Sequence, residues 1–141
     1  MEGARVLDLY CGTGALAIEA LSRGAATATL VDRDTRAALG NVERLGLGDR
    51  VSLVRADIGR WLGGEDEARP RFDLVFVDAP YRLADRVGQA LDTHLPRLLA
   101  EGGTAVVESA ARRALRLDSL ESQRQRRYGS TDVSFYRLEA T

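Results

Sequence analysis

VLDLYCGTGALAIEAL, residues Val6 to Leu21, stands near the start of the chain and decides how the rest is interpreted. The apolar run Arg5–Tyr10 predicts a buried strand, and Ala15–Gly24 predicts a helix with a glycine at its stop position. Between them, Gly12 and Gly14 predict a tight loop. A strand, a glycine loop and a helix in this order place a cofactor at the helix N-terminus. The motif leaves open which cofactor that is.

The rest of the chain continues the alternation of short apolar runs with longer helical ones. Further strands are predicted at Ala28–Asp32, Arg50–Asp57, Phe72–Asp78 and Thr104–Ser109, and helices at Asp34–Gly46, Ile58–Leu62 and Ala84–Ala100. In the second helix, Leu39, Val42 and Leu45 recur on one face. The tail from Ser122 to Glu139 predicts a hairpin that turns near YGST. Right-handed crossovers then give one α/β domain over residues 1–141, a doubly wound, Rossmann-like, mostly parallel sheet that ends in an antiparallel β-hairpin.

Composition narrows the class of protein. The 141 residues suit one domain, and the net charge of −1 excludes a polycation that would bind any nucleic acid. The apolar runs are too short to cross a membrane, and the start, MEGARVLD, has no apolar leader region. Cys11 and His94 are the sole cysteine and histidine, so no zinc or iron site is expected. The low cysteine content predicts a reducing compartment, the cytosol.

The residue ahead of the glycine loop discriminates between cofactors. GTGALA fits the dinucleotide fingerprint, with Asp32 near the expected acidic position, but many glycine turns fit it. Asp8 lies four residues before Gly12, where its charge would repel a pyrophosphate by a few kcal/mol. A carboxylate suits a cofactor that presents a cation instead. S-adenosylmethionine carries both an ammonium and a sulfonium group, and the sequence therefore favours it over NAD.

Further acidic residues follow the predicted strands. Ligands of doubly wound sheets bind at the carboxyl ends of the strands, where the loop at Tyr10–Gly14 and these acids should meet. Asp32, with Arg33 beside it, can accept both ribose hydroxyls, and Asp57 with Ile58 can bracket the adenine. Taken singly, Asp32 or Asp57 could instead be a helix N-cap. Their positions at successive strand ends favour cofactor binding.

A second motif, FVDAPY, ends at Tyr81 directly after the most apolar strand. Pro80 restricts Ala79 to an extended backbone, which directs the carbonyl of Ala79. The carboxylate of Asp78 and a neighbouring carbonyl can then accept hydrogen bonds from an aromatic amine, while Tyr81 offers a ring for stacking. An aromatic amine is a poor nucleophile, and positioning with electrostatic stabilisation is what such a site must supply.

In this order and spacing, DLYCGTG, VDRD, AD and DAPY resemble the S-adenosylmethionine-dependent methyltransferases that act on amino groups through a [D/N]-P-P-[Y/F/W] motif. The closing segment RRYGSTDVSFYR is similar to the end of the bacterial 16S ribosomal RNA guanine-N2 methyltransferase family. The resemblance implies a class I methyltransferase sheet, S-adenosylmethionine as cofactor, and 16S ribosomal RNA or an assembling small subunit as partner. It assigns to the base Asp78, Pro80 and Tyr81, and to the cofactor Gly12, Gly14 and Asp32.

Two departures from the family pattern stand out. Ala79 replaces the first proline of the motif, and the chain begins at the first strand, without the N-terminal basic hairpin and helix that are usual in the family. The complete set of candidates is larger than the family motif. Cofactor-binding candidates are Asp8, Cys11, Gly12, Gly14, Asp32, Arg33, Asp57 and Ile58, and substrate-binding candidates are Ala79, Tyr81, Arg124, Arg126 and Arg127.

All 20 basic residues are arginine. The stretch from Ala110 to Tyr128 contains six of them and only two acidic residues. Such a run is either a solvated face or a nucleic-acid patch. Three other functions stay open: an N-methyltransferase acting on DNA adenine or on a protein or small-molecule amine, a non-catalytic nucleic-acid-binding module with this fold, and a nicotinamide enzyme, which Asp8 disfavours. A monomer is predicted.

Overall fold

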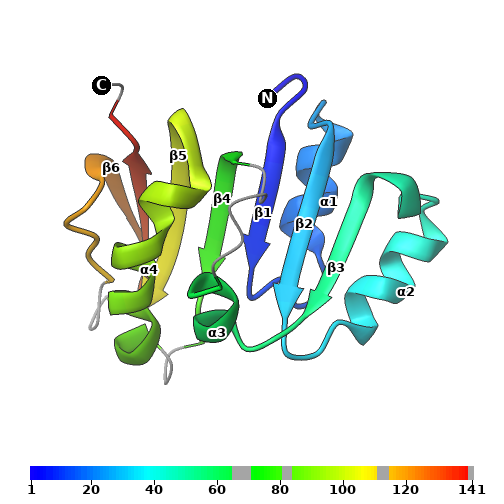
Figure 1. The fold of residues 1–141 in the computed structure, drawn as a ribbon, viewed down its shortest axis with the longest axis horizontal. Helices are drawn as coiled ribbons and strands as arrows, with labels where there is room; N and C mark the ends of the chain where they lie inside the picture. The colour runs from blue at the N-terminus through cyan, green and yellow to red at the C-terminus, as the bar shows by residue number, and fades with distance from the viewer. Residues whose placement is uncertain (65–70, 81–83, 111–114, 140–141) are drawn as a thin grey trace.

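The computed structural model describes residues 1–64, 71–80, 84–110 and 115–139. Within them, seven strands form one sheet whose two faces carry the helices (Figure 1). The elements, in chain order, are β1 (Arg5–Leu9), α1 (Ala15–Ser22), β2 (Thr27–Asp32), α2 (Arg36–Arg44), a 3-10 turn (Gly48–Arg50), β3 (Val51–Arg55), α3 (Ile58–Leu62), β4 (Phe72–Asp78), α4 (Ala84–Leu98), β5 (Leu99–Ala110), β6 (Glu121–Tyr128) and β7 (Thr131–Arg137).

The strands lie in the order β3-β2-β1-β4-β5-β7-β6. Strands β1 to β5 pair in parallel, and β7 pairs antiparallel with both β5 and β6. The order reverses between β1 and β4, which are neighbours although β2 and β3 separate them in the sequence. Ligands bind beside such a switch point in doubly wound sheets. The predicted fold class is confirmed, including the antiparallel hairpin at the end.

Each face of the sheet has its own core. In Figure 1, α3 and α4 lie in front of the sheet, and α1 lies behind β1 and β2. The front core contains Leu7, Val75 and Leu91, all fully buried. The rear core contains Val6 and Leu30 and is built largely from alanines of the helices and strands. Because side chains alternate along a strand, Leu7 and Leu9 face the front core while Val6 and Asp8 face the rear.

Two details differ from the sequence prediction. Strand β5 begins at Leu99, directly after α4, and a register shift between Phe72 and Leu74 accommodates the glycines near its start. In α2, Leu39 and Leu45 are 44% and 51% exposed, and Ala38 and Val42 are buried instead. Ala38 is fully buried where α2 passes the loop, and its Cβ would lie 3.6 Å from a Cβ added at Gly14. Of the three residues predicted to form the apolar face of this helix, only Val42 is buried, and the prediction was wrong for Leu39 and Leu45.

The rear face of the second half of the sheet is more open than the front. Alternate residues of β4, β5 and β7 on this side, Leu74, Phe76, Val106, Val133 and Phe135, are only partly buried. Among the described residues, α1 makes its contacts with β1 and β2, and no helix packs over β5 and β7 on this side. The surface beside the carboxyl end of β4 is thus accessible from the rear.

Candidate active site

The glycine loop turns sharply at the carboxyl end of β1. Tyr10, Gly12 and Gly14 all have positive φ angles, of 62°, 54° and 82°. A Cβ added at Gly14 would lie 3.0 Å from Cδ2 of Leu30, so only glycine fits between the loop and the core. A Cβ at Gly12 would meet nothing within 4 Å, so the loop is open on that side. Gly14 thus serves the fold, and Gly12 leaves room for a ligand.

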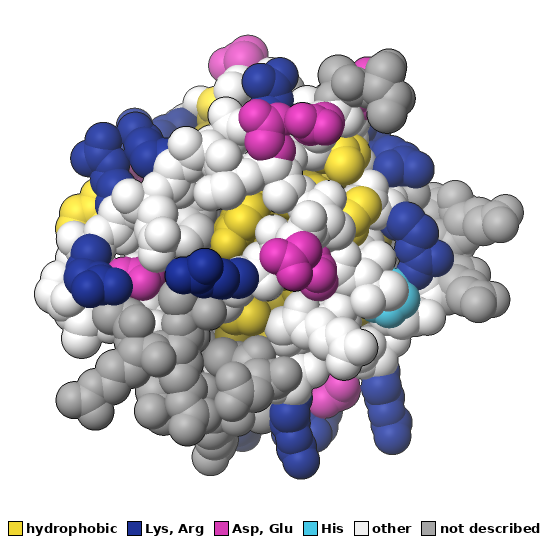
Figure 2. Space-filling view, turned by 90° about the vertical axis from the view of Figure 1, so that its left-hand side faces the viewer, with side chains coloured by type: hydrophobic (Ala, Val, Ile, Leu, Met, Phe, Trp, Pro, Cys, Tyr) yellow, Lys and Arg dark blue, Asp and Glu magenta, His cyan; other side chains and the backbone are white. Residues whose placement is uncertain are grey.

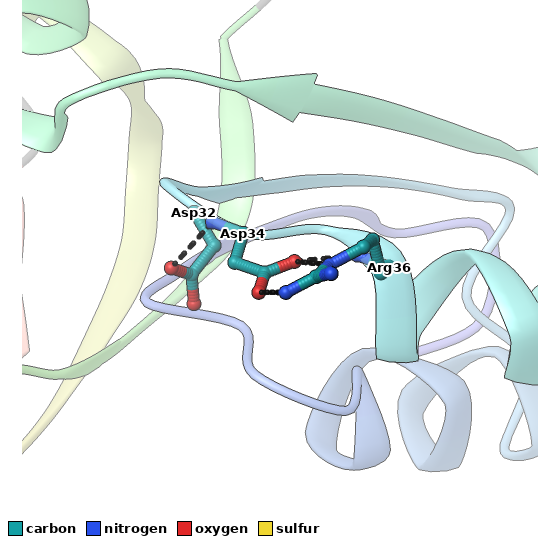
Figure 3. Close-up of polar contacts among 3 residues, drawn as sticks. All are labelled: Asp32, Asp34 and Arg36. Atoms are coloured by element: carbon teal, nitrogen blue, oxygen red, sulfur yellow. Dashed lines mark hydrogen bonds and ion pairs between the residues drawn. The ribbon is translucent and has the colours of Figure 1, made fainter.

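Asp32 ties this loop to the end of β2. Its Oδ2 accepts a hydrogen bond from the Gly12 N–H at 2.9 Å, and its Oδ1 faces the Asp34 N–H at 3.4 Å. Asp34, not Asp32, forms the ion pair with Arg36, at 2.7 Å (Figure 3). The residue before α2 is Thr35, so Asp32 is not the N-cap that was the alternative. None of the described residues forms an ion pair with its carboxylate, which keeps lone pairs for a ligand's hydroxyl groups.

Asp8 is a buried carboxyl group without full hydrogen bonding. The residue is 1% exposed, and its Oδ2 has no partner among the described residues. The pKa of Asp8 is raised to about 7, first by burial and then by the charges of Asp78 and Asp32, against a backbone hydrogen bond from Ala17 that lowers it. An unpaired buried acceptor costs free energy. A cation placed beside Oδ2 would remove that cost.

Asp57 and its neighbours have structural roles at the end of β3. Asp57 caps α3, with its Oδ1 accepting from the Arg60 N–H at 3.1 Å, and its Oδ2 lies 3.7 Å from Arg33. The N-cap alternative therefore holds for Asp57. Ile58 is 2% exposed within the front core. Contact of Asp57 and Ile58 with an adenine, and of Arg33 with the cofactor, stays a prediction.

Cys11 lies inside the loop but belongs to the rear core, at 8% exposure. Burial and the nearby charges of Asp8 and Asp32 raise the pKa of the thiol to about 12. A thiol in this state is not a nucleophile at neutral pH. Cys11 therefore acts as a packing residue whose backbone, and not its sulfur, shapes the loop.

Asp78 ends β4 at the switch point. It lies two residues beyond Phe76, the register partner of Asp8, and on the same face of the sheet as Asp8. Asp78 reaches the surface, and partial burial of its carboxyl group raises its pKa. Ala79 packs in the front core and Pro80 is exposed. Tyr81 lies outside the described residues, so its stacking role stays a prediction.

Glu108 is a candidate that sequence reasoning missed. It is the register partner of Asp78 on β5, so both carboxylates lie side by side on the rear face. Burial, and then the charge of Asp78, raise the pKa of Glu108. The signal in the sequence was an acid in TAVVES, at the end of the fifth strand, as at the ends of the second and fourth. Its pairing with Asp78 depends on a register that spacing alone does not reveal.

The three predicted RNA-binding arginines do not form one patch. Arg127 points to the front side, where it binds the buried Asp132 at 2.8 Å. Arg124 stacks on Phe135 at 4.7 Å from the ring centroid, on the rear face, and Arg126 pairs with Val133 on the same face. Figure 2, viewed from the side of the hairpin and α4, shows arginines scattered among acidic and uncharged side chains. Of these three arginines, Arg124 and Arg126 share the rear face with Asp78.

These residues fit S-adenosylmethionine better than a dinucleotide. The open side of Gly12 accommodates a ligand, the unpaired Oδ2 of Asp8 calls for a cation, and Asp32 offers acceptors for ribose hydroxyls. In the described part of the chain, no group of three or more histidine, cysteine, aspartate or glutamate residues could hold a metal ion. Within those same residues, no helix is long and apolar enough to cross a membrane.

Comparison with known sequences places the chain among proteins described as methyltransferases. It matches the family "Conserved hypothetical protein 95" over residues 1–137. It is 34% identical to the "Putative rRNA methyltransferase YlbH" of Bacillus subtilis, over 96% of this chain and 77% of that protein. It is 31% identical to ribosomal RNA large subunit methyltransferase K/L of Aeromonas hydrophila, over 79% of this chain but 17% of that protein. It is 32% identical to ribosomal RNA small subunit methyltransferase D of Buchnera aphidicola, over 57% of this chain and 42% of that protein.

Solved structures share the same architecture. The "Putative methyltransferase yhhF" from Escherichia coli superposes with a TM-score of 0.82 at 28% identity, over 99% of this chain and 78% of that one. The fold also matches SMU.776, which is described as a putative methyltransferase complexed with SAH. The TM-score is 0.81 at 17% identity, over 97% of this chain and 46% of that one. The class I methyltransferase fold is confirmed.

The matched range includes the glycine loop, the acids at the strand ends and the hairpin, and the identity to a full-length relative extends over nearly the whole chain. The chain therefore belongs to the family "Conserved hypothetical protein 95", which the sequence relatives identify with methyltransferases of ribosomal RNA.

Proposed function

We propose that this chain transfers a methyl group from S-adenosylmethionine to the exocyclic N2 of a guanine in 16S ribosomal RNA, in the cytoplasm. The observation that carries the proposal is the arrangement of Asp8 and Asp78. Two carboxylates lie on one face of the adjacent strands β1 and β4, beside the open glycine loop. Asp8 is buried and its Oδ2 is unpaired among the described residues, which suits a cationic cofactor. Asp78 is exposed, which suits a large methyl acceptor.

The residues divide the work between cofactor and acceptor. When bound, S-adenosylmethionine supplies a methyl group on a positively charged sulfur. The sulfur keeps the electrons of the broken S–CH3 bond and becomes a neutral thioether. Asp8 and Asp32 hold its cationic end and its ribose. Asp78 accepts a hydrogen bond from the amine, orients its lone pair toward the methyl carbon, and stabilises the positive charge that develops on nitrogen. The surplus proton then leaves to solvent at this exposed edge.

The arrangement of the hairpin supports RNA as the acceptor. Asp78, Glu108, Val133 and Arg126 form one transverse row across β4, β5, β7 and β6. An RNA strand that presents a base to Asp78 can continue along this row to Arg126 and to Arg124, whose guanidinium stacks on Phe135. The row therefore connects the base position at Asp78 to the positive charges of Arg124 and Arg126, which can bind the phosphates of the RNA.

The direct test is methyl transfer from labelled S-adenosylmethionine to 16S ribosomal RNA, to a small-subunit precursor particle and to 23S ribosomal RNA, followed by digestion to nucleosides. N2-methylguanosine from the small-subunit substrates is the expected product, and mapping gives its position. Label in N6-methyladenosine, or in the 23S RNA alone, would overturn the proposed substrate. Cofactor binding without transfer to any substrate would favour the non-catalytic alternative.

Asp32→Ala should weaken S-adenosylmethionine binding by about 1.5–3 kcal/mol, because a charged acceptor of ribose hydroxyls is lost. Asp34→Ala is the matched control, since Asp34 lies two residues further along and is engaged by Arg36. Titration calorimetry on both variants measures the difference. Equal affinities for the two variants would remove Asp32 from the cofactor site.

Neutralising Arg124 and Arg126 together, each to Gln, should flatten the salt dependence of RNA binding. Loss of two phosphate contacts lowers the slope of log K against log salt by about 1.4 for a single strand. Arg23→Gln with Arg44→Gln is the control, because both side chains are exposed on helices away from the hairpin. A slope that is the same in both double variants would show that Arg124 and Arg126 form a solvated face.

A further inference from the structure

Glu108 and Asp78 present two acceptors side by side at the place where the base is proposed to bind. They are register partners on adjacent parallel strands, about 4.8 Å apart. Both side chains lie on the rear face, and neither forms a hydrogen bond or ion pair with any residue that the structure describes. Asp8 has an unpaired Oδ2 that is buried nearby on the same face, where a cationic ligand would satisfy it.

The donor pattern of the ligand follows from this pair. Two carboxylates accept hydrogen bonds and cannot donate, so they fit a ligand edge with two adjacent N–H donors. On guanine, N1–H and the N2 amine are such neighbours. On adenine, the N6 amine lies beside N1, an acceptor, whose lone pair would face a carboxylate.

We infer that Glu108 is the specificity-determining residue of this site, which accepts a hydrogen bond from guanine N1–H while Asp78 holds the N2 amine. The inference deepens the proposed function and rests on it. Glu108 does not contact the reacting nitrogen, and its role is to orient the base and to exclude bases without a second donor. Two carboxylates side by side repel each other in the ligand-free protein. Hydrogen bonds from guanine N1–H and from the N2 amine would offset this repulsion when the base binds.

The test uses 2-aminopurine, which keeps the 2-amino group but has an acceptor at N1. Ribosomal RNA fragments carry either guanosine or 2-aminopurine at the mapped position. The unaltered protein should methylate guanosine at least about 100-fold more efficiently, because a site built to bind a donor rejects the analogue that lacks it. Glu108→Gln can rotate its amide to donate to N1, so this preference should fall to about 10-fold or less.

Glu101→Gln, an exposed glutamate at the other end of β5, is the matched control and should keep the full preference. S-adenosylmethionine affinity and the thermal midpoint, measured for each variant, report any change in folding. A guanosine preference that is unchanged in Glu108→Gln, with guanosine still methylated by the unaltered protein, would overturn the role of Glu108 alone. Failure of the unaltered protein to methylate guanosine at N2 would overturn the proposed function together with this inference.

Discussion

Asp78→Ala is expected to lower the rate of methyl transfer by about 10²–10³-fold, the cost of losing one preorganised electrostatic partner. The affinity for S-adenosylmethionine should change much less, because Asp78 lies on the acceptor side of the site. Folding should be preserved, since Asp78 reaches the surface at the end of β4 and forms no hydrogen bond or ion pair with the residues that the structure describes. Single-turnover transfer to small-subunit RNA, with calorimetric titration of the cofactor, separates these two effects.

The matched variant is Asp78→Asn, which keeps an acceptor oxygen at the same place. It should retain activity within about 10-fold of the unaltered protein, since a hydrogen bond from the amine can still form. Transfer by Asp78→Ala at the rate of the unaltered protein would refute the role given to this carboxylate. A loss of cofactor affinity equal to the loss in rate would place Asp78 in the cofactor site instead.

Asp8→Asn is expected to raise the free energy of unfolding of the ligand-free protein at pH 8 by about 2–4 kcal/mol. The reason is the raised pKa of Asp8, about 7, set first by burial. Between about pH 4 and pH 7 the folded state binds one more proton at Asp8 than the unfolded state does. The free energy of unfolding of the unaltered protein therefore falls as the pH rises through this window and stays low above it. Asparagine does not titrate, so the variant escapes this loss.

Urea unfolding at pH 5 and pH 8 measures the effect as a difference between the two proteins, which removes the contributions of Asp78 and Glu108. Asp49→Asn, an exposed carboxylate far from the site, is the control and should parallel the unaltered protein. The same Asp8→Asn protein should bind S-adenosylmethionine more weakly at pH 8, since no anion then faces the cation. Identical pH dependence in Asp8→Asn and the unaltered protein would show that Asp8 is already ionised in the fold.

The sequence alone was sufficient for the architecture and for the type of cofactor site. Alternation of apolar runs with helical runs is a local signal, and it located the first four strands to within two residues of their observed ends, whereas β5 begins five residues before its predicted start. Gly14 was also predictable, because a loop that joins a buried strand to a helix needs positive φ angles. Asp8 could be proposed as functional because its charge disfavours a pyrophosphate beside the loop, and Asp78 because of its place in DAPY.

Burial and pairing were not predictable from the pattern. The spacing of Leu39 and Leu45 is that of an apolar face, yet both are exposed, because α2 turns Ala38 and Val42 toward the core instead. Ile58 was proposed to pack on an adenine, and its burial at 2% exposure in the front core could not be read from the sequence. Arg124, Arg126 and Arg127 are close in sequence, but strand alternation sends Arg127 to the opposite face.

What the sequence determined by itself was the order of the elements and the kinds of residue that follow each strand, because both depend on neighbours along the chain. What only the tertiary structure decided was which of those residues meet. Asp78 and Glu108 are 30 positions apart, and their side-by-side placement depends on the register between β4 and β5, which the shift after Phe72 sets. The raised pKa of Asp8 likewise needs desolvation by a complete core and the charges of Asp78 and Asp32 from two other strands. Register and desolvation are properties of the assembled sheet, and no stretch of the chain contains them alone.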